Sequence, residues 1–313
     1  MLTTSDTLTP SIIHSQHHHG IMETYPAAYS PTGYGRHDGE AVIQTPHATK
    51  TVQGDGLEAI CTLLATMDGT TAASDLIAQV PESDPEQIDL LYEAGLAYDA
   101  QAIPTGLSEA GWERYLEPVL PAMSQPTQQT LPDRLAARSV AVFGDHDPVS
   151  GVCDRLRAAG VSVGERSAGD LQGQGDDPDV IFLSEQLERS DSWTAANEAW
   201  ATSSATLVKT RLTETGWRLG PVFTADARAC LNCVYTRVDA NKAGGQLFDE
   251  TVTGTPPYMQ AYTDTVTELL FRALLEQLPR YLNDQFVVYD HYQGRRQTPR
   301  VFASPHCEVC DNA

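Results

Sequence analysis

Hydrophobic and polar positions follow two different periods in the first third of the chain. Between residues 38 and 100, short alternating runs at 41–45 and 48–53 precede segments with apolar residues every three or four positions. The alternation is typical of paired strands, and the wider spacing is typical of helices with one buried face. We therefore predict two small strands followed by three short helices.

The ends of these helices carry sequence signals. The first helix is expected to stop at Gly69, because a glycine commonly follows the last helical turn. The third helix is expected to begin after Ser83, whose spacing from Glu86 is that of a capping box, with Pro85 in the first turn, and to stop at Gly95. Small strands followed by three helices of this length predict a winged-helix domain.

From residue 138 onward, β-branched apolar runs alternate with amphipathic helices. The runs SVAVFG, DVIFLS and ATLVK are separated by helical patterns, and QFVVYDHY follows nearer the end. Such alternation predicts βαβ units and a mostly parallel sheet. The predicted fold class is α/β: a Rossmann-like domain over residues 138–313, preceded by the winged-helix domain over 38–100.

The remaining segments precede or connect these domains. Residues 1–37 are rich in Ser, Thr, His, Pro and Gly without a sustained period, which predicts a disordered tail. Residues 101–137 contain a helical pattern around WERYLEPVL and then the Pro- and Gln-rich run MSQPTQQTLPD. This pattern predicts a helix and a linker between the domains.

The composition is strongly acidic: 42 Asp and Glu against 20 Lys and Arg give a net charge of −22, with lysine at three positions. Such a surface repels phosphate backbones and anionic lipid, so neither nucleic acid nor a membrane is an expected partner. It is typical of halophilic organisms, whose high ionic strength screens self-repulsion, although an ordinary acidic protein has the same features. Without a long apolar run or a secretory signal, the chain is expected in the cytoplasm.

The first strand-to-helix turn of the α/β domain is where a nucleotide phosphate would bind. It contains Gly144 and Gly151, but the residues between them do not complete the pattern GxGxxG, and Asp145 and Asp147 add negative charge. The sequence contains no Walker-type GK[ST] motif, and Lys209 is the one lysine of this domain that precedes the cysteine pairs. We interpret the sheet as an architectural Rossmann-like fold, with residual nucleotide binding as the less favoured alternative.

Two CxxC pairs carry the clearest chemistry. Cys230 and Cys233 form the first pair, and Cys307 and Cys310 form the second. Four thiolates at this spacing suit tetrahedral zinc, and a site closed by four sulfurs has no open position for catalysis, so the zinc is expected to be structural. An iron–sulfur cluster or two redox dithiols would use the same residues. The remaining cysteines lie on apolar helix faces and are expected in the core: Cys61 and Cys153.

The pattern GDGLEA, LLATMDGT and QIDLLYEAGL resembles the PqqD-like winged helix, the recognition element of peptide-modifying (RiPP) systems. In that family the leader of a precursor peptide adds as an extra strand beside the third helix. The third helix here contains no Arg or Lys, which disfavours DNA. The apolar residues of this segment are also candidates for the core. The resemblance implies these peptide-binding residues: Thr49, Lys50, Thr51, Val52, Gln53, Ile88, Leu91 and Tyr92.

The stretch LGPVFTADARACLNCVYTR, with its second CxxC pair far along the chain, resembles ThiF-like relatives of ubiquitin-activating enzymes. It is most similar to the cyclodehydratase C proteins of thiazole/oxazole-modified microcin (bacteriocin-type) biosynthesis. This resemblance implies a subunit without catalytic residues that binds the leader and activates a YcaO-type partner, which binds ATP and forms azoline rings. The alternative is an active ThiF-type adenylyltransferase acting on a carboxylate of a peptide or carrier protein. A homodimer is compatible with either function.

Overall fold

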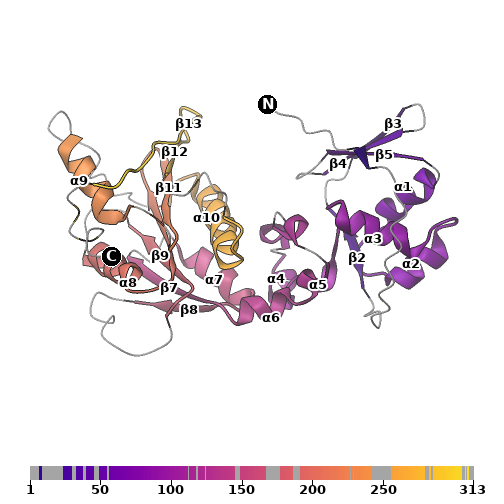
Figure 1. The fold of residues 1–313 in the computed structure, drawn as a ribbon, viewed down its shortest axis with the longest axis horizontal. Helices are drawn as coiled ribbons and strands as arrows, with labels where there is room; N and C mark the ends of the chain where they lie inside the picture. The colour runs from indigo at the N-terminus through magenta and orange to yellow at the C-terminus, as the bar shows by residue number, and fades with distance from the viewer. Residues whose placement is uncertain are drawn as a thin grey trace. The chain divides into compact units, whose positions relative to one another are not determined.

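The computed structural model describes most of the chain, which divides into two compact units: Met1–Asp133 and Arg134–Ala313. The division falls inside the segment 101–137 that was predicted to connect two domains. Figure 1 traces both units from the N-terminus to the C-terminus. The described residues are 7–8, 24–29, 33–37, 40–45, 49–54, 56–111, 113–117, 119–123, 125–144, 149–166, 177–185, 191–225, 227, 229–241, 255–278, 282, 285–304, 307 and 309.

The first unit contains a four-stranded sheet in the order β1-β5-β4-β3, a two-stranded sheet of β2 and β6, and short helices. Strands β4 and β5 are antiparallel, as the alternating pattern predicted. Its elements are β1 (Thr7–Leu8), β2 (Pro26–Ala28), β3 (Gly33–His37), β4 (Glu40–Gln44), β5 (Thr49–Gln53), α1 (Leu57–Thr66), α2 (Ala73–Gln79), α3 (Pro85–Glu93), β6 (Ala97–Asp99), η1 (Ala100–Ala102), α4 (Thr105–Glu109), η2 (Glu113–Tyr115), η3 (Leu120–Ala122), α5 (Gln125–Gln129) and α6 (Leu131–Ala136), the last of which runs past the division.

The three helices α1, α2 and α3 form because each has one apolar face that packs on the strands. Ile43 of β4 and Val52 of β5 belong to the same buried cluster as the apolar residues of these helices. Helix α3 is capped by Asp84, whose carboxylate accepts a hydrogen bond from the Gln87 backbone N–H (3.0 Å), while the Gln87 side chain accepts one from the Asp84 N–H (3.3 Å). The capping box therefore lies one residue later than the predicted one at Ser83. The winged-helix assignment itself stays a prediction.

Part of the segment predicted as a disordered tail is ordered. Strand β2 pairs with β6, and the Ala73 N–H donates to the Thr24 carbonyl (2.9 Å). Tyr29 is buried, and its ring centroid lies 4.9 Å from that of Tyr98. The prediction of a disordered tail over residues 1–37 is therefore wrong for residues 7–8, 24–29 and 33–37. The polar average composition of the segment concealed single aromatic residues, such as Tyr29, that anchor it.

The connecting segment 101–137 also differs from its prediction. The continuous helix expected around WERYLEPVL is replaced by two single 3₁₀ turns, η2 and η3, since the prolines at 118 and 121 lack the N–H that a longer helix requires. The Pro- and Gln-rich run contains α5 and the start of α6. Gln128 of α5 is buried and donates to the carbonyls of Leu120 (3.2 Å) and Met123 (3.3 Å).

The second unit is built on a seven-stranded sheet in the order β13-β12-β11-β10-β9-β7-β8. Strands β8, β7, β9 and β10 are parallel, as predicted, whereas β11, β12 and β13 extend the sheet in antiparallel fashion. Figure 1 shows α7 and α10 on one face of the sheet and α8 and α9 on the other. The elements are β7 (Ser139–Gly144), α7 (Ser150–Ala158), β8 (Ser162–Glu165), β9 (Val180–Ser184), α8 (Asp191–Ala201), β10 (Thr206–Leu212), β11 (Gly216–Phe223), α9 (Leu231–Asn241), α10 (Met259–Leu274), β12 (Val287–Asp290) and β13 (Arg295–Gln297).

The antiparallel extension begins at a tight turn between β10 and β11. The Thr213 N–H donates to the Gly216 carbonyl (2.9 Å), which closes the turn. A side chain at Gly216 would place its Cβ 1.9 Å from the Tyr289 carbonyl oxygen of β12, so glycine is required for the close approach of these strands. The β10–β11 pair brings together three basic side chains: Lys209, Arg211 and Arg218.

Helix α10 is amphipathic and covers β9 and β10. The Tyr262 hydroxyl of α10 shares a buried hydrogen bond with the Thr210 hydroxyl of β10 (2.8 Å). Arg155 of α7 forms an ion pair with Asp264 of α10 (3.6 Å), which joins the two helices on this face. No helix in the described part of the chain combines the length and the apolar character that crossing a lipid bilayer requires.

Candidate metal centre and basic cavity

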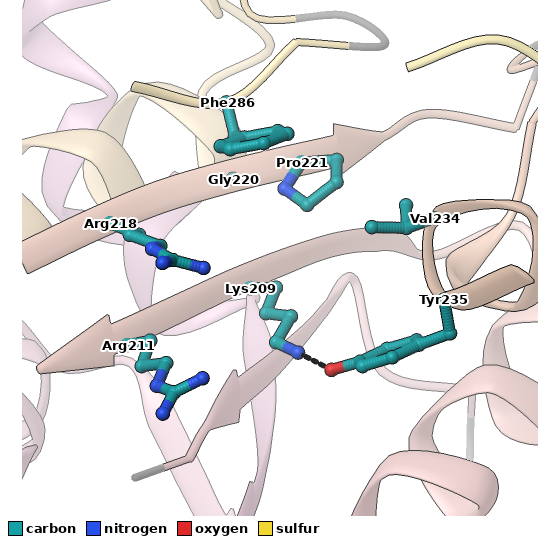
Figure 2. A pocket seen from close by; sticks show the side chains of 8 residues that line it. All are labelled: Lys209, Arg211, Arg218, Gly220, Pro221, Val234, Tyr235 and Phe286. Atoms are coloured by element: carbon teal, nitrogen blue, oxygen red, sulfur yellow. Dashed lines mark hydrogen bonds between the residues drawn. The ribbon is translucent and has the colours of Figure 1, made fainter. Parts of the chain in front are cut away.

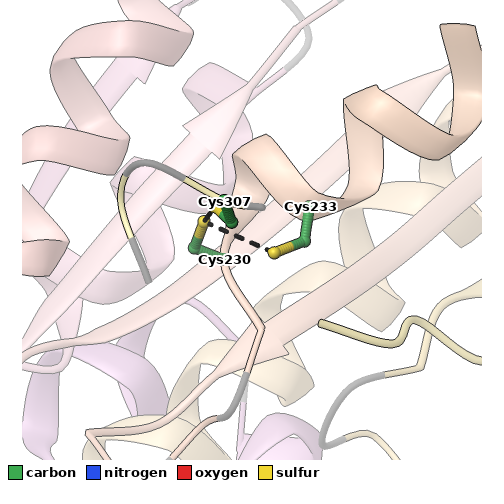
Figure 3. Close-up of side chains that lie close together, drawn as sticks. All are labelled: Cys230, Cys233 and Cys307. Atoms are coloured by element: carbon green, nitrogen blue, oxygen red, sulfur yellow. Dashed lines mark hydrogen bonds between the residues drawn. The ribbon is translucent and has the colours of Figure 1, made fainter. Parts of the chain in front are cut away.

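Three cysteines from two distant parts of the chain meet at the start of α9. Cys230 directly precedes the helix, Cys233 lies in its first turn, and Cys307 follows the last strand. Figure 3 shows the three side chains converging, with Cys230 Sγ 4.0 Å from Cys233 Sγ and 3.5 Å from Cys307 Sγ. All three are buried, and their sulfur atoms lie within 4.8 Å of one another.

The donor set fits a tetrahedral thiolate metal site. Zinc–sulfur bonds of ~2.3 Å at the tetrahedral angle place neighbouring sulfurs ~3.8 Å apart, between the two separations observed. Two N–H groups also point at the sulfurs: the Ser304 backbone donates to Cys233 Sγ (3.2 Å), and the Asn232 amide donates to Cys307 Sγ (3.7 Å). Such hydrogen bonds stabilise thiolate ligands.

The sequence contains three further cysteines: Cys310, Cys61 and Cys153. Cys310, the predicted fourth ligand, lies outside the described residues. Cys61 and Cys153 are buried on α1 and α7 and do not belong to the cluster, and burial raises the pKa of the Cys153 thiol. Both positions agree with the prediction that these two cysteines are core residues.

The predicted peptide-binding strand has a neighbour on its outer side. Thr7 and Leu8 of β1 pair in parallel with Thr51 and Val52 of β5, so the strand expected to be the edge lies between β1 and β4. Along β5, Thr49 is exposed, Val52 is buried, and the remaining residues are half-buried: Lys50, Thr51 and Gln53.

The predicted groove wall is part of the core of the first unit. Ile88, Leu91 and Tyr92 are each buried and belong to the apolar cluster that also contains Val52. Burial raises the pKa of the Tyr92 hydroxyl, with the charge of Asp99 as a second cause. These side chains therefore stabilise the unit as core residues.

The turn after β7 begins with a residue that must be glycine. Gly144 has φ +94°, and a Cβ there would lie 1.9 Å from the Ser184 carbonyl oxygen of β9. Gly144 therefore permits the close packing of β7 and β9. This packing explains why the position is a glycine without any reference to phosphate binding. The residues of the turn that carry Asp145 and Asp147 lie outside the described part of the chain.

A cavity that the sequence analysis did not predict lies beside α9. Its charged wall consists of Lys209 and Arg211 of β10 and Arg218 of β11 (Figure 2). The signal was present in the sequence, since basic residues at alternate positions of one strand are unexpected in so acidic a chain. The sequence did not indicate that β10 pairs with β11. That pairing brings Arg218 close to Lys209 and Arg211.

No protein-family model and no curated protein matches the sequence. Several solved structures match its fold. One is a heterocyclase in complex with substrate and cofactor (TM-score 0.60, 14% identity), and the match covers 92% of this chain and 39% of that chain. A second is the heterocyclase TruD (TM-score 0.60, 13% identity), matched over 92% of this chain and 43% of TruD. A third is E. coli MccB (TM-score 0.58, 10% identity), matched over 92% of this chain and 97% of MccB.

The chain thus has a fold shared by these proteins, which agrees with the predicted α/β class. It spans about two fifths of the length of the two heterocyclases and nearly the whole length of MccB. MccB, described as a microcin C7 biosynthetic enzyme, has been solved with N-formylated MccA, and also with AMPCPP and MccA together. At these identities the likeness establishes the fold and not the activity.

Proposed function

We propose that this chain binds the leader of a ribosomal precursor peptide and activates a YcaO-type partner for ATP-dependent azoline formation in the cytoplasm. The observation that carries the proposal is the fold, which matches two heterocyclases and MccB over 92% of the chain. In this proposal the YcaO-type partner binds the ATP and closes the ring.

The proposed peptide site is β5. Main-chain hydrogen bonds to an added strand supply affinity, and alternate side chains supply specificity. Because strand side chains alternate with a period of two, Lys50 lies on the same face of β5 as Val52, which belongs to the buried cluster that includes residues of α3. A leader strand beside β5 would therefore contact Lys50 and the margin of the α3 core.

The proposed metal is a structural zinc held by Cys230, Cys233, Cys307 and Cys310. Zinc would link the segment around Cys307 to the start of α9, two parts of the chain that are far apart in the sequence. A four-sulfur site supplies no open coordination position, so this zinc would fix the fold and take no part in ring closure.

The test is reconstitution with a YcaO-type partner. The chain should raise turnover of a leader-bearing substrate far more than that of a leaderless core, since tethering through the leader raises effective concentration by up to ~10²–10⁴-fold. Lys50→Glu should reduce this advantage. Arg157→Glu, the same charge change on an exposed residue of α7 in the second unit, is the matched control and should not. Equal stimulation of both substrates would contradict the proposal.

A second function has one observation in its favour. The chain matches nearly the whole of MccB, which has been solved with a nucleotide analogue and its peptide. An adenylyltransferase acting on a peptide or carrier-protein carboxylate would exchange pyrophosphate into ATP in a substrate-dependent way. Such exchange by the protein without a partner would replace the subunit proposal with this function.

A further inference from the structure

The cavity beside α9 gathers an unusual amount of positive charge. The chain has 20 basic residues among 313 and a net charge of −22, yet Lys209, Arg211 and Arg218 line one cavity. Arg211 lies directly opposite Arg218 across the β10–β11 ladder. Like charges in directly opposed positions repel each other across a pair of strands, and an anion bound near both guanidinium groups would reduce that repulsion.

Burial of these charges also costs free energy. Lys209 is 8% exposed and Arg211 is 3% exposed, and charged side chains are seldom so deeply buried in a protein without compensation. Lys209 is compensated inside the fold, because its ammonium lies 3.3 Å from the Glu185 carboxylate, donates to the Tyr235 hydroxyl and lies 4.5 Å from the centroid of the same ring. Arg211 and Arg218 also have interactions within the chain.

The cavity has an apolar side as well as the side lined by the three basic residues. Val234 and Tyr235 come from α9, Pro221 from β11, and Phe286 from the segment before β12. Among the described residues, none that line the cavity carries a carboxylate, and Glu185 reaches Lys209 from outside the wall. Figure 2 shows the two guanidinium groups and the ammonium entering the same space from adjacent strands.

The position of the cavity in the sheet suits a ligand. The Glu185 N–H donates to the Thr210 carbonyl (3.3 Å), which places Lys209 and Arg211 at the carboxyl ends of parallel strands β9 and β10. Ligands of α/β sheets bind beyond these ends. The strand order reverses between β7 and β9, where a nucleotide would be expected, whereas this cavity lies on β10 and β11.

We propose that this cavity binds an oxyanion, a carboxylate or a phosphate group, attached to an apolar or aromatic body. Guanidinium groups bind both kinds of oxyanion in bidentate fashion, and two adjacent arginines surround one such group. The cavity has a volume of about 50 Å³, several times the ~10–15 Å³ that one water needs, which is room for a single anionic group. The apolar wall then contacts the remainder of the ligand. The inference goes beyond the proposed function and does not depend on it.

The experiment titrates the full-length protein with benzoate, phenyl phosphate and benzyl alcohol at constant ionic strength, followed by thermal unfolding and ligand-observed NMR. Constant ionic strength is needed because salt alone screens the repulsion within so acidic a chain. We expect benzoate, phenyl phosphate or both to give a saturable rise in the unfolding temperature, with no such rise for neutral benzyl alcohol. Preference for benzoate identifies a carboxylate ligand, and preference for phenyl phosphate identifies a phosphate ligand.

The variants assign binding to the cavity. Arg218→Gln, at the half-buried position, should weaken the dissociation constant of the bound anion at least tenfold while the protein stays folded. Arg211→Gln should do the same, but Arg211 is buried, so Arg218→Gln is decisive if Arg211→Gln does not fold. Arg157→Gln removes one charge from an exposed residue and should bind like the wild type. Absence of saturable binding by either anion, equal binding by Arg218→Gln, or equal weakening by Arg157→Gln would overturn the proposal.

Discussion

Cys233 and Tyr235 stand two residues apart on α9, and their side chains belong to two different sites. Cys233 lies in the cysteine cluster, whereas Tyr235 lines the basic cavity, accepts a hydrogen bond from Lys209 and packs edge-on against Trp193 (4.9 Å between ring centroids). A metal bound by the cluster would therefore fix the first turns of α9 and, through them, one wall of the cavity.

The first prediction concerns this metal. Purified protein should carry about one zinc per chain, and Cys233→Ala should lose it and destabilise the second unit, because structural zinc binding contributes directly to folding free energy. Elemental analysis of the purified variants measures the metal. Cys61→Ala removes a buried cysteine from the first unit and should retain the zinc. Iron in place of zinc, or no metal at all, would contradict the prediction.

The second prediction concerns the buried amide of Gln128. Its side chain accepts a hydrogen bond from the Asp99 N–H (3.2 Å) and donates to the carbonyls of Leu120 and Met123, which links β6 to the segment before α5. Gln128→Ala should lower the free energy of unfolding of the first unit by about 1–3 kcal/mol, since buried polar groups lose their partners. Urea denaturation measures this change. Gln79→Ala, at an exposed helical position, should change stability by less than about 0.5 kcal/mol.

The elements predicted well are those whose structure is decided locally. Helix α1 was predicted from its apolar spacing and α3 from its cap and proline, and parallel strands β7, β9 and β10 from their buried β-branched runs. The strand β11 was not predicted, because Gly220 and Pro221 interrupt its sequence and resemble a loop. Its ladders with β10 and β12 override that local preference.

In the candidate sites, too, features set by local sequence were predicted and features set by strand pairing were not. The cysteine pairs carry their own spacing, so the sequence predicted that Cys230, Cys233 and Cys307 would meet. The basic cavity depends on a register between strands, and nothing in the local sequence states that Arg211 lies opposite Arg218. The pairing of β1 with β5 is a further tertiary feature, because about forty residues separate the two strands and the two residues of β1 carry no pairing signal of their own.

The third prediction concerns pH. The pKa of Asp89 on α3 is raised, first by partial desolvation of its carboxyl group, although the residue as a whole is exposed, and then by the neighbouring charges of Glu93 and Glu86. The folded state therefore favours protonated Asp89, so its contribution to stability is fully present below the usual aspartate pKa and is lost as the pH rises through the raised value. Asp89→Asn should be more stable than the wild type at neutral pH, and the difference should disappear at a pH below ~3.

Asp68 supplies the control of opposite sign. Its carboxylate accepts hydrogen bonds from the backbone N–H groups of Thr70 (2.8 Å) and Thr71 (3.2 Å), and the first of these is the largest cause of its lowered pKa. The contribution of ionised Asp68 to stability is therefore present above the usual aspartate pKa and is lost as the pH falls through the lowered pKa. Asp68→Asn should therefore be less stable than the wild type at neutral pH. Urea denaturation across a pH series compares the two variants, and shifts of the same sign would contradict the assignment.

The last prediction concerns the strand that lies beside the proposed peptide site. Because Thr7 and Leu8 pair with β5, a leader that adds at this side of β5 must first displace β1. A pairing this short is worth about 1–2 kcal/mol. Deleting residues 1–10 should therefore tighten binding of a labelled leader peptide by about five- to thirtyfold in a fluorescence anisotropy titration. Lys50→Glu in the shortened protein should weaken binding again. Unchanged affinity after the deletion would show that β1 does not compete with the leader, and absence of binding by both forms would contradict the peptide site on β5 itself.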